Sequence, residues 1–288
     1  MRPRSLIFLH IPKTGGTTLR NIIAEQYEDD SVFSIGPLIN EAIQGFRHQP
    51  QTRRQRIRLL QGHMAFGLHI HLERPISYFT LLRDPMERAL SDYCYVKTSS
   101  HHPLHRLVAG MTVGDYLQSG LTGQLSNGQT RLLCGDCMPG EPGIPGVRPM
   151  EEQDLELAIS NLNEHFIVVG LVERFDETLT LLKRKLHWKR PLYVKANVGP
   201  KDVGHNMLSE SDERLIAKLN DLDIRLYQTA ERLFRQQVNA EGLGFKLELL
   251  SFKMMNGLYQ VYHQLRYRLH PRIRFGLANL VRRLRIST

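Results

Sequence analysis

The stretch SLIFLHIPKTGGTTL, from Ser5 to Leu19, decides the fold class of this chain. Its first part, residues 5–11, is a short apolar run of the kind found in strands that are buried on both faces. Residues 12–18 then combine two glycines, three threonines and a lysine, and residues 19–27 are compatible with a helix. A strand, a glycine-containing loop and a helix in this order predict the first unit of an α/β fold.

The loop has the chemistry of a phosphate-binding site. A glycine-rich turn at a helix N-terminus presents backbone N–H groups and the positive end of the helix dipole to an anion. Gly15 and Gly16 allow close backbone approach, Thr17 and Thr18 add hydroxyl donors, and Lys13 adds a positive charge. The lysine precedes the glycines, unlike that of the nucleotide-triphosphate loop GxxxxGK[ST], so ATP is disfavoured. The alternative is a structural turn without a ligand.

A second strand is predicted over residues 76–82, and a helix follows it to about residue 96. Three residues mark the start of this helix: Asp84 as the N-cap, Pro85 at the first helical position and Glu87 in a capping box. The strand therefore ends in a corner that leads directly into a helix, as the first strand does.

Arg83 leaves the end of this second strand, and Ser91 lies two turns into the helix. A bidentate arginine and a hydroxyl suit a compact dianion such as phosphate. Two phosphate sites at the carboxyl edge of one sheet imply a ligand that is phosphorylated at both ends. The alternatives are a surface ion pair of Arg83 with Glu87 and a solvent-facing Ser91.

The rest of the chain continues the alternation of strands and helices. A third strand is expected over residues 166–172, and we expect helical segments at 111–121, 129–133, 151–163, 173–186 and from 209 to about 238. We therefore predict a three-layer α/β/α fold, in which a central parallel sheet carries helices on both faces.

The positive charge is concentrated at the end of the chain. The net charge is +9, but residues 246–288 hold nine Lys and Arg against one Glu, so the remainder is nearly neutral. Apolar residues recur at helical spacing among these arginines, which predicts basic amphipathic helices. We divide the chain into a domain over residues 1–245 and a helical tail over residues 246–288. The tail either lies on an anionic membrane surface or packs on the body or a second copy.

Cysteine content and hydropathy suggest a compartment. The chain has three cysteines, Cys94, Cys134 and Cys137, which suit a reducing environment, and the CxxC pair at 134–137 lacks a second ligand pair for a metal. No apolar run approaches the roughly 20 residues of a membrane span. We therefore expect no metal and a cytoplasmic location, with the protein peripheral to the inner face of the membrane if the tail binds lipid.

The two phosphate motifs resemble those of a known family. HIPKTGGTTL at 10–19 is similar to the 5′-phosphosulfate-binding loop of the sulfotransferases, and LLRDPMERALSDYCY at 81–95 resembles their 3′-phosphate-binding strand and helix. Three further segments agree: QGHMAFG at 61–67, NGQTRLL at 127–133 and GLVERFDETLTLL at 170–182. The resemblance covers roughly residues 5–235 and is greatest to heparan sulfate O-sulfotransferases and bacterial carbohydrate sulfotransferases.

This resemblance implies a P-loop-like fold and an enzyme that transfers a sulfuryl group from 3′-phosphoadenosine 5′-phosphosulfate (PAPS) to an acceptor hydroxyl, releasing PAP. Lys13 would then stabilise the leaving 5′-phosphate, because in-line transfer depends on positioning and on cationic groups. The donor-binding residues implied are Lys13, Thr14, Gly15, Gly16, Thr17, Thr18, Arg83, Ser91 and, less directly, Lys201.

A general base is needed to accept the proton of the acceptor hydroxyl, and an imidazole with a pKa near 6.5 suits this task. His63 matches the general base of the family, with His69 and His71 as rivals, while His10 is expected to pack locally. The implied acceptor is a carbohydrate or glycoconjugate. Its candidate contacts are His69, Asn127, Gln129 and Arg131, the last three with a structural role as the alternative.

Two other functions compete with sulfuryl transfer. A P-loop nucleotide kinase or NTPase is disfavoured by the position of the lysine and by the lack of a strand-end Asp for magnesium. A basic nucleic-acid-binding protein is disfavoured because the positive excess lies in residues 246–288. We therefore expect no nucleic acid as a partner.

Overall fold

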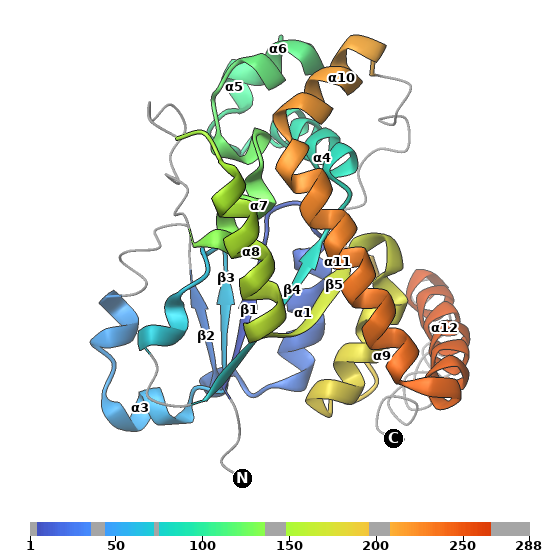
Figure 1. The fold of residues 1–288 in the computed structure, drawn as a ribbon. Coiled ribbons are helices and arrows are strands. Elements are labelled where there is room, and N and C mark those ends of the chain that lie inside the picture. Colours follow the sequence, from blue (N-terminus) through green and yellow to red (C-terminus); the bar gives the residue numbers. More distant parts are fainter. Residues whose placement is uncertain (1–4, 36–43, 72–74, 136–147, 196–207, 266–288) are drawn as a thin grey trace.

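The computed structural model describes residues 5–35, 44–71, 75–135, 148–195 and 208–265. Its centre is a five-stranded sheet in the order β2-β3-β1-β4-β5, with every pairing parallel (Figure 1). The strands are β1 Ser5–Leu9, β2 Val32–Ile35, β3 Leu59–Gly62, β4 Ile76–Leu82 and β5 Phe166–Leu171. The predicted central parallel sheet is therefore confirmed.

The strands differ in how clearly their sequence predicts them. β1, β4 and β5 are the three predicted strands, and β1, the central one, is buried along its whole length. β2 and β3 were not predicted, because each has only four residues and a polar residue interrupts its apolar pattern. β3 is nevertheless completely buried, since it lies between β1 and β2.

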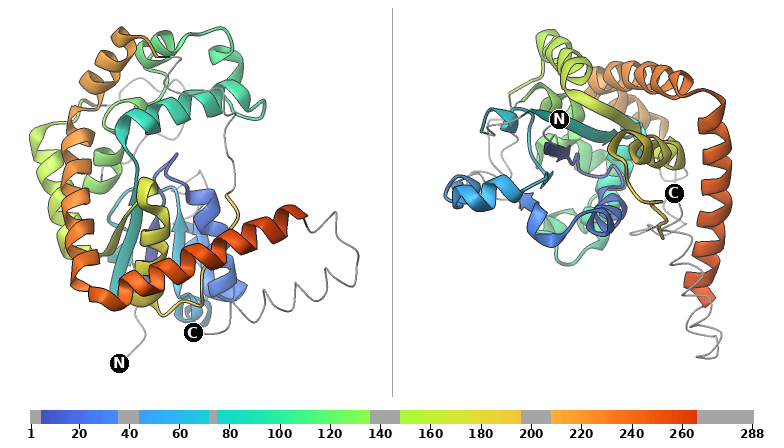
Figure 2. Two further views of the ribbon diagram at one scale, coloured as in Figure 1. Left: turned by 90° about the vertical axis from the view of Figure 1, so that its right-hand side faces the viewer. Right: turned by 90° about the horizontal axis from the view of Figure 1, so that it is seen from below.

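Helices cover both faces of the sheet. Figures 1 and 2 show α8 (Glu152–His165) and α11 (Asp221–Ala240) on one face and α1 (Gly16–Gln26) on the other, while α9 (Phe175–Leu186) follows β5. The predicted three-layer α/β/α architecture is thus confirmed. Its main core is formed by the buried strands together with apolar side chains of these helices.

A second, smaller apolar cluster lies beyond the carboxyl edge of the sheet. It is formed by α4 (Pro85–Thr98), α5 (His105–Val108), α6 (Val113–Gln118) and α10 (Glu210–Leu219), which Figure 1 shows at the top of the molecule. The remaining short elements are α3 Gln51–Arg56, α7 Gly128–Cys134, η1 Asp29–Ser31, η2 Leu68–His71, η3 Gly123–Leu125 and η4 Val172–Arg174.

The N-caps predicted at Asp84 and Ser209 are confirmed, but the capping box expected of Glu87 is not formed, because the Asp84 N–H donates to Glu173, and one predicted helix is interrupted. The Asp84 carboxylate accepts the Glu87 N–H at 3.1 Å, and Ser209 forms a reciprocal capping box with Asp212. The helix predicted from residue 209 to about 238 is in fact α10 and α11, divided at Asn220. The buried Asn220 amide donates to two backbone carbonyls, so its tertiary contacts outweigh helical continuity.

The last described element is α12, Gly242–Leu265, which contacts α9 and α11. The predicted domain boundary after residue 245 falls inside α12, and the division of the chain into two domains stays a prediction. The second amphipathic helix expected in the tail lies outside the described residues. Within the described part of the chain, no helix combines the length and the apolarity that crossing a bilayer requires.

Candidate functional site

Three neighbouring strands deliver the predicted site residues to one place. β1 lies between β3 and β4, and all three run parallel. His63 follows β3, the glycine loop follows β1, and Arg83 follows β4. Because parallel strands end at the same edge, the fold brings these three segments together where the direction of strand order reverses, the usual position of a ligand in such sheets.

The loop holds an unusual backbone conformation. Lys13 and Gly15 both have positive φ, 68° and 73°, and the Thr14 hydroxyl donates to the Ile11 carbonyl at 2.8 Å. The Thr14 side chain is fully buried and therefore stabilises the loop. α1 begins at Gly16 without a capping side chain, so the N–H groups of its first turn have no acceptor within the helix. Such a turn suits an anion.

The two adjacent glycines are required for different reasons. A Cβ on Gly15 would make only ordinary van der Waals contacts, but the residue adopts a left-handed conformation, which favours glycine. A Cβ on Gly16 would lie 1.7 Å from His10 Nε2, so any larger residue there collides with the His10 ring. Beside them, Thr17 is exposed and Thr18 is buried. The loop therefore packs directly on His10.

Arg83 connects the second motif to the first. Its Nη1 donates to the Lys13 carbonyl at 3.3 Å, across 70 residues of sequence. Its Nη2 donates to Glu87 at 3.1 Å, so the ion pair considered as an alternative is also present. The side chain is 22% exposed, and its buried Nε has no hydrogen-bond acceptor among the described residues. The guanidinium thus retains a donor beside the loop.

One face of α4 lies between the Arg83 guanidinium and the Lys13 ammonium group. Glu87, Ser91 and Tyr95 recur at four-residue spacing and therefore lie on the same side of the helix. Arg83 pairs with Glu87 at one end, and Lys13 Nζ lies 3.8 Å from the centre of the Tyr95 ring, about 12 Å further along the helix. Ser91, half-buried, lies between the two cations. Tyr95 was missed, although its spacing from Ser91 would have indicated it.

The electrostatic surroundings of Lys13 are mixed. Burial lowers its pKa, the Asp92 carboxylate raises it in part, and the Arg83 cation lowers it further. A lysine held among other cations gains from an anionic ligand, because the ligand relieves repulsion as well as binding the ammonium group.

His63 has the geometry of a general base. Its Nδ1 donates to the His10 carbonyl at 3.0 Å, because a carbonyl oxygen can only accept. In the neutral ring the free lone pair then lies on Nε2. Desolvation by the surrounding protein lowers the pKa of His63 below 6.5; the His10 hydrogen bond opposes this, and Arg20 and Lys13 add to it. His63 as a residue is exposed, although its ring stacks on His10, and a pKa below 6.5 keeps the imidazole neutral at pH 7.

His10 packs locally, as predicted. Its ring stacks on Phe8 at 5.3 Å and on His63 at 4.2 Å between ring centres. It is 6% exposed, and burial, with smaller contributions from the charges of His63, Arg20 and Lys13, lowers its pKa to about 2. His10 is therefore a neutral support between the loop and His63.

His69, a rival base and candidate acceptor contact, is engaged elsewhere. Its Nδ1 lies 3.0 Å from the Tyr78 hydroxyl, and its ring stacks on His165 within an aromatic cluster that includes Phe66. These contacts favour His63 over His69 as the base. His71 is at the end of η2, and its side chain lies outside the described residues.

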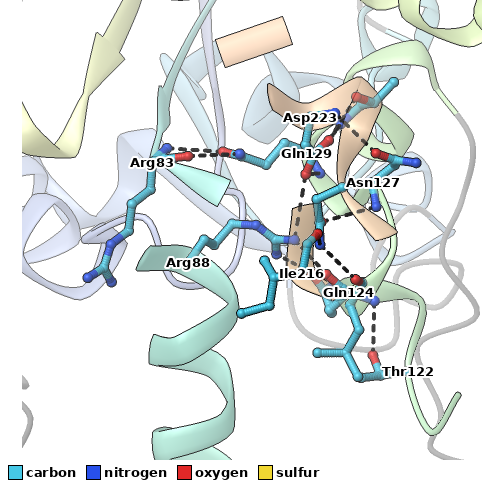
Figure 3. A network of polar contacts seen from close by, with 11 residues as sticks. Arg83, Arg88, Thr122, Gln124, Asn127, Gln129, Ile216 and Asp223 are labelled. Carbon is cyan, nitrogen blue, oxygen red and sulfur yellow. Dashed lines mark hydrogen bonds and ion pairs between the residues drawn. The ribbon is translucent and has the colours of Figure 1, made fainter. Parts of the chain in front are cut away.

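Asn127, Gln129 and Arg131 lie in or beside a buried polar network, drawn in Figure 3. The Gln129 amide pairs with both backbone groups of Arg83, at 3.0 and 2.9 Å, and Asn127 Oδ1 accepts the Asp223 N–H. Arg131 donates to the Arg148 carbonyl at 2.7 Å. These contacts favour the alternative of a structural role, since each of the three side chains bonds to backbone and Gln129 holds that of Arg83 itself.

The centre of this network, which the sequence did not indicate, is an ion pair. Arg88 Nη2 lies 3.6 Å from Asp223 Oδ2, and both side chains are fully buried. Asp223 also accepts the N–H groups of Gln129 and Thr130 at the start of α7, and Arg88 donates to the Gln124 carbonyl. The pair therefore joins α4, α7 and α11 directly beneath Arg83.

Several predicted residues fall outside this description. Lys201 and Cys137 lie outside the described residues. Cys134 is buried and donates to the Arg131 carbonyl at 3.2 Å. The residues that the structure describes contain no group of three His, Cys, Asp or Glu side chains that could hold a metal ion.

A sequence profile of the galactose-3-O-sulfotransferase family matches residues 1–248, a range that includes both predicted phosphate motifs and His63. The chain belongs to this family. Galactose-3-O-sulfotransferase 2 of Mus musculus is 22% identical over 82% of the chain and 63% of its own length, and heparan-sulfate 6-O-sulfotransferase 3-B of Danio rerio is 26% identical over 81% and 64%. The chain therefore spans somewhat less than two thirds of these relatives. The predicted resemblance to sulfotransferases is confirmed.

A solved structure was also matched, that of mouse sulfotransferase SULT7A1 complexed with PAP. It is 13% identical, with a TM-score of 0.39, over 78% of this chain and 66% of that one.

The predicted cytoplasmic location is wrong. The galactose-3-O- and heparan-sulfate sulfotransferases that this family member matches are Golgi-resident proteins. The prediction rested on cysteine content and on the absence of an apolar run long enough to span a membrane, neither of which specifies the compartment of a chain that spans only part of its relatives.

Proposed function

We propose that this member of the galactose-3-O-sulfotransferase family transfers a sulfuryl group from PAPS to a carbohydrate hydroxyl. The observation that carries the proposal is the hydrogen bond from Arg83 to the Lys13 carbonyl, because it joins the two anion-binding motifs into one site. A ligand with phosphate groups at both ends matches two cationic positions on one helix face. Family membership supports the same donor.

The residues present fit such a donor. The first turn of α1 and Lys13 form the position for the 5′-phosphosulfate, and Arg83 with Ser91 form the position for the 3′-phosphate. The partly exposed guanidinium of Arg83 and the half-buried Ser91 hydroxyl are suitable donors for phosphate oxygens. Lys201, outside the described residues, remains a proposed contact to the 3′ end.

The chemistry assigned to the chain is positioning, proton transfer and charge stabilisation. His63 Nε2 accepts the proton of the acceptor hydroxyl as that oxygen bonds to sulfur. The bond from sulfur to the bridging oxygen of the 5′-phosphate breaks, and Lys13 stabilises the negative charge that develops there. His10 holds His63 in the required tautomer through its carbonyl.

The acceptor is proposed to be a sugar hydroxyl. The names of the relatives specify galactose and heparan sulfate as their acceptors, which supports a carbohydrate for this chain. Association of residues 246–288 with a membrane or with a second copy is likewise a proposal.

The test combines ligand binding with turnover. Adenosine 3′,5′-bisphosphate at 100 times its Kd adds about 2.7 kcal/mol to the unfolding free energy, so it should raise the Tm by several degrees without magnesium, whereas ATP with magnesium should not. His63→Ala should keep this shift and lose about 10²- to 10⁴-fold in turnover. The matched control His69→Ala should retain turnover. A shift with ATP and magnesium alone would favour a kinase, and normal turnover of His63→Ala would refute the assigned base.

A further inference from the structure

One side of α12 exposes an apolar stripe. Its members are 40–78% exposed, although each is a large aliphatic or methionine side chain. The stripe consists of Leu243, Leu247, Leu250, Met254, Leu258, Val261 and Leu265. Contiguous apolar surface of this kind on a folded protein indicates an interaction site.

The opposite side of α12 fixes the direction in which the stripe faces. Phe245, Phe252 and Asn256 are buried against the body, and the Asn256 side chain accepts the Tyr193 N–H at 2.8 Å. Glu248 forms ion pairs with α9. Because one side of the helix is held in this way, the stripe faces outward. Figure 2 shows α12 running along the body and past its edge.

The stripe runs nearly straight along α12. Its seven residues follow one another at intervals of three or four, a mean of about 3.7 residues, which is close to the 3.6-residue turn of a straight helix. A repeat of 11 residues over three turns can also wind around a second helix with a right-handed twist, so the spacing suits both a planar surface and a helical partner. The charges beside the stripe distinguish the two partners.

The charges beside the stripe are positive. Lys246 and Lys253 are exposed on α12, whereas its one carboxylate, Glu248, is paired with Lys183 and Arg184. The sequence that follows, residues 266–288, contains seven arginines and no acidic residue. Two copies facing each other would bring like charges together, whereas an anionic bilayer complements them.

We propose that the stripe of α12 docks this protein on an anionic lipid bilayer, with the apolar side chains in the interface and the basic residues at the headgroups. The inference does not depend on the proposed sulfuryl transfer, because no residue of the stripe is among those assigned to the site. Failure of one therefore leaves the other unaffected.

The test is vesicle sedimentation of the full chain. We expect binding to vesicles of phosphatidylglycerol and phosphatidylcholine, and much weaker binding to phosphatidylcholine alone. The variant Leu247→Glu/Leu250→Glu/Met254→Glu should reduce the partition coefficient at least about tenfold relative to the control Gln236→Glu/Asn239→Glu/Ala240→Glu, which adds the same charge at exposed positions of α11. Lys246→Gln/Lys253→Gln, which removes the two exposed lysines of α12, should weaken binding to the anionic vesicles.

Three results would overturn the proposal. The first is a wild-type chain that does not sediment with anionic vesicles, which is also expected if residues 266–288 cover the stripe. The second is equal partitioning of the stripe variant and its control. The third is a concentration-dependent dimer in analytical ultracentrifugation that the stripe variant abolishes, because the occupant is then a second copy.

Discussion

Arg83 and Arg88 are five residues apart, yet they belong to two different regions of the molecule. Figure 3 shows the Arg88 side chain directed into the buried network and that of Arg83 directed away from it. Arg88 is fully buried against Asp223, whereas Arg83 is 22% exposed beside the loop. Both leave Nε without an acceptor among the described residues, but only Arg83 is accessible to a ligand. Exposure, rather than residue type, separates the arginine proposed to bind a ligand from the structural one.

The two regions depend on each other. The Gln129 side chain pairs with both backbone groups of Arg83, and the Gln129 N–H is held by Asp223. The buried ion pair therefore positions the backbone from which the exposed guanidinium extends. A buried network that fixes the backbone, with a partly exposed guanidinium extending from it, is the arrangement expected of a preorganised anion site.

The largest expected effect is the loss of stability when the buried arginine, Arg88, is removed. Arg88→Ala leaves the Asp223 carboxylate buried without its cation, so it should lower the unfolding free energy by about 3–5 kcal/mol. Urea unfolding measures this loss. The matched variant Arg83→Ala removes a partly exposed ion pair and should cost about 1 kcal/mol or less. Equal unfolding midpoints for the two variants would contradict the distinction between a buried structural arginine and a partly exposed one.

The next largest effect is on ligand affinity, when the partly exposed arginine, Arg83, is removed. Arg83→Ala removes a charged hydrogen-bond donor worth about 1.5–3 kcal/mol, so the Kd for adenosine 3′,5′-bisphosphate should rise about 10- to 150-fold. Isothermal titration calorimetry measures this change. Arg83→Lys should recover part of the affinity, since it restores charge without bidentate geometry. An unchanged Kd would show that Arg83 serves only its pair with Glu87.

The effect that is smallest near neutral pH, and grows in acid, concerns the histidines, where buried His10 supports exposed His63. The pKa of His10 falls to about 2 on folding, so below pH 6.5 the unfolded chain binds a proton that the native state excludes. Stability should therefore decrease by about 1.4 kcal/mol per pH unit as the pH falls below 6.5. The contribution of His10 is isolated by comparing unfolding curves of the wild type and of His10→Phe, which keeps a stacked ring, at several pH values. Parallel pH profiles would contradict it.

Local signals predicted much of the fold. The apolar runs of β1, β4 and β5 and the caps at Asp84 and Ser209 are encoded within a few residues of where they act. β2, β3 and the interruption at Asn220 have no such signal. The short strands exist because neighbouring strands cover them, and Asn220 ends α10 because its amide finds carbonyl acceptors on another segment.

The sequence by itself determined the family, the glycine loop, and the strand-to-helix corner at Arg83, because each depends on the order of neighbouring residues. Only the tertiary structure decided that the loop and Arg83 meet, that His63 is held by His10, and that Asn127 and Gln129 are buried supports. The physical reason is that hydrogen bonding and desolvation depend on which distant segments pack together. The order of residues specifies which polar and charged side chains are present, and packing decides which of them remain available to a ligand.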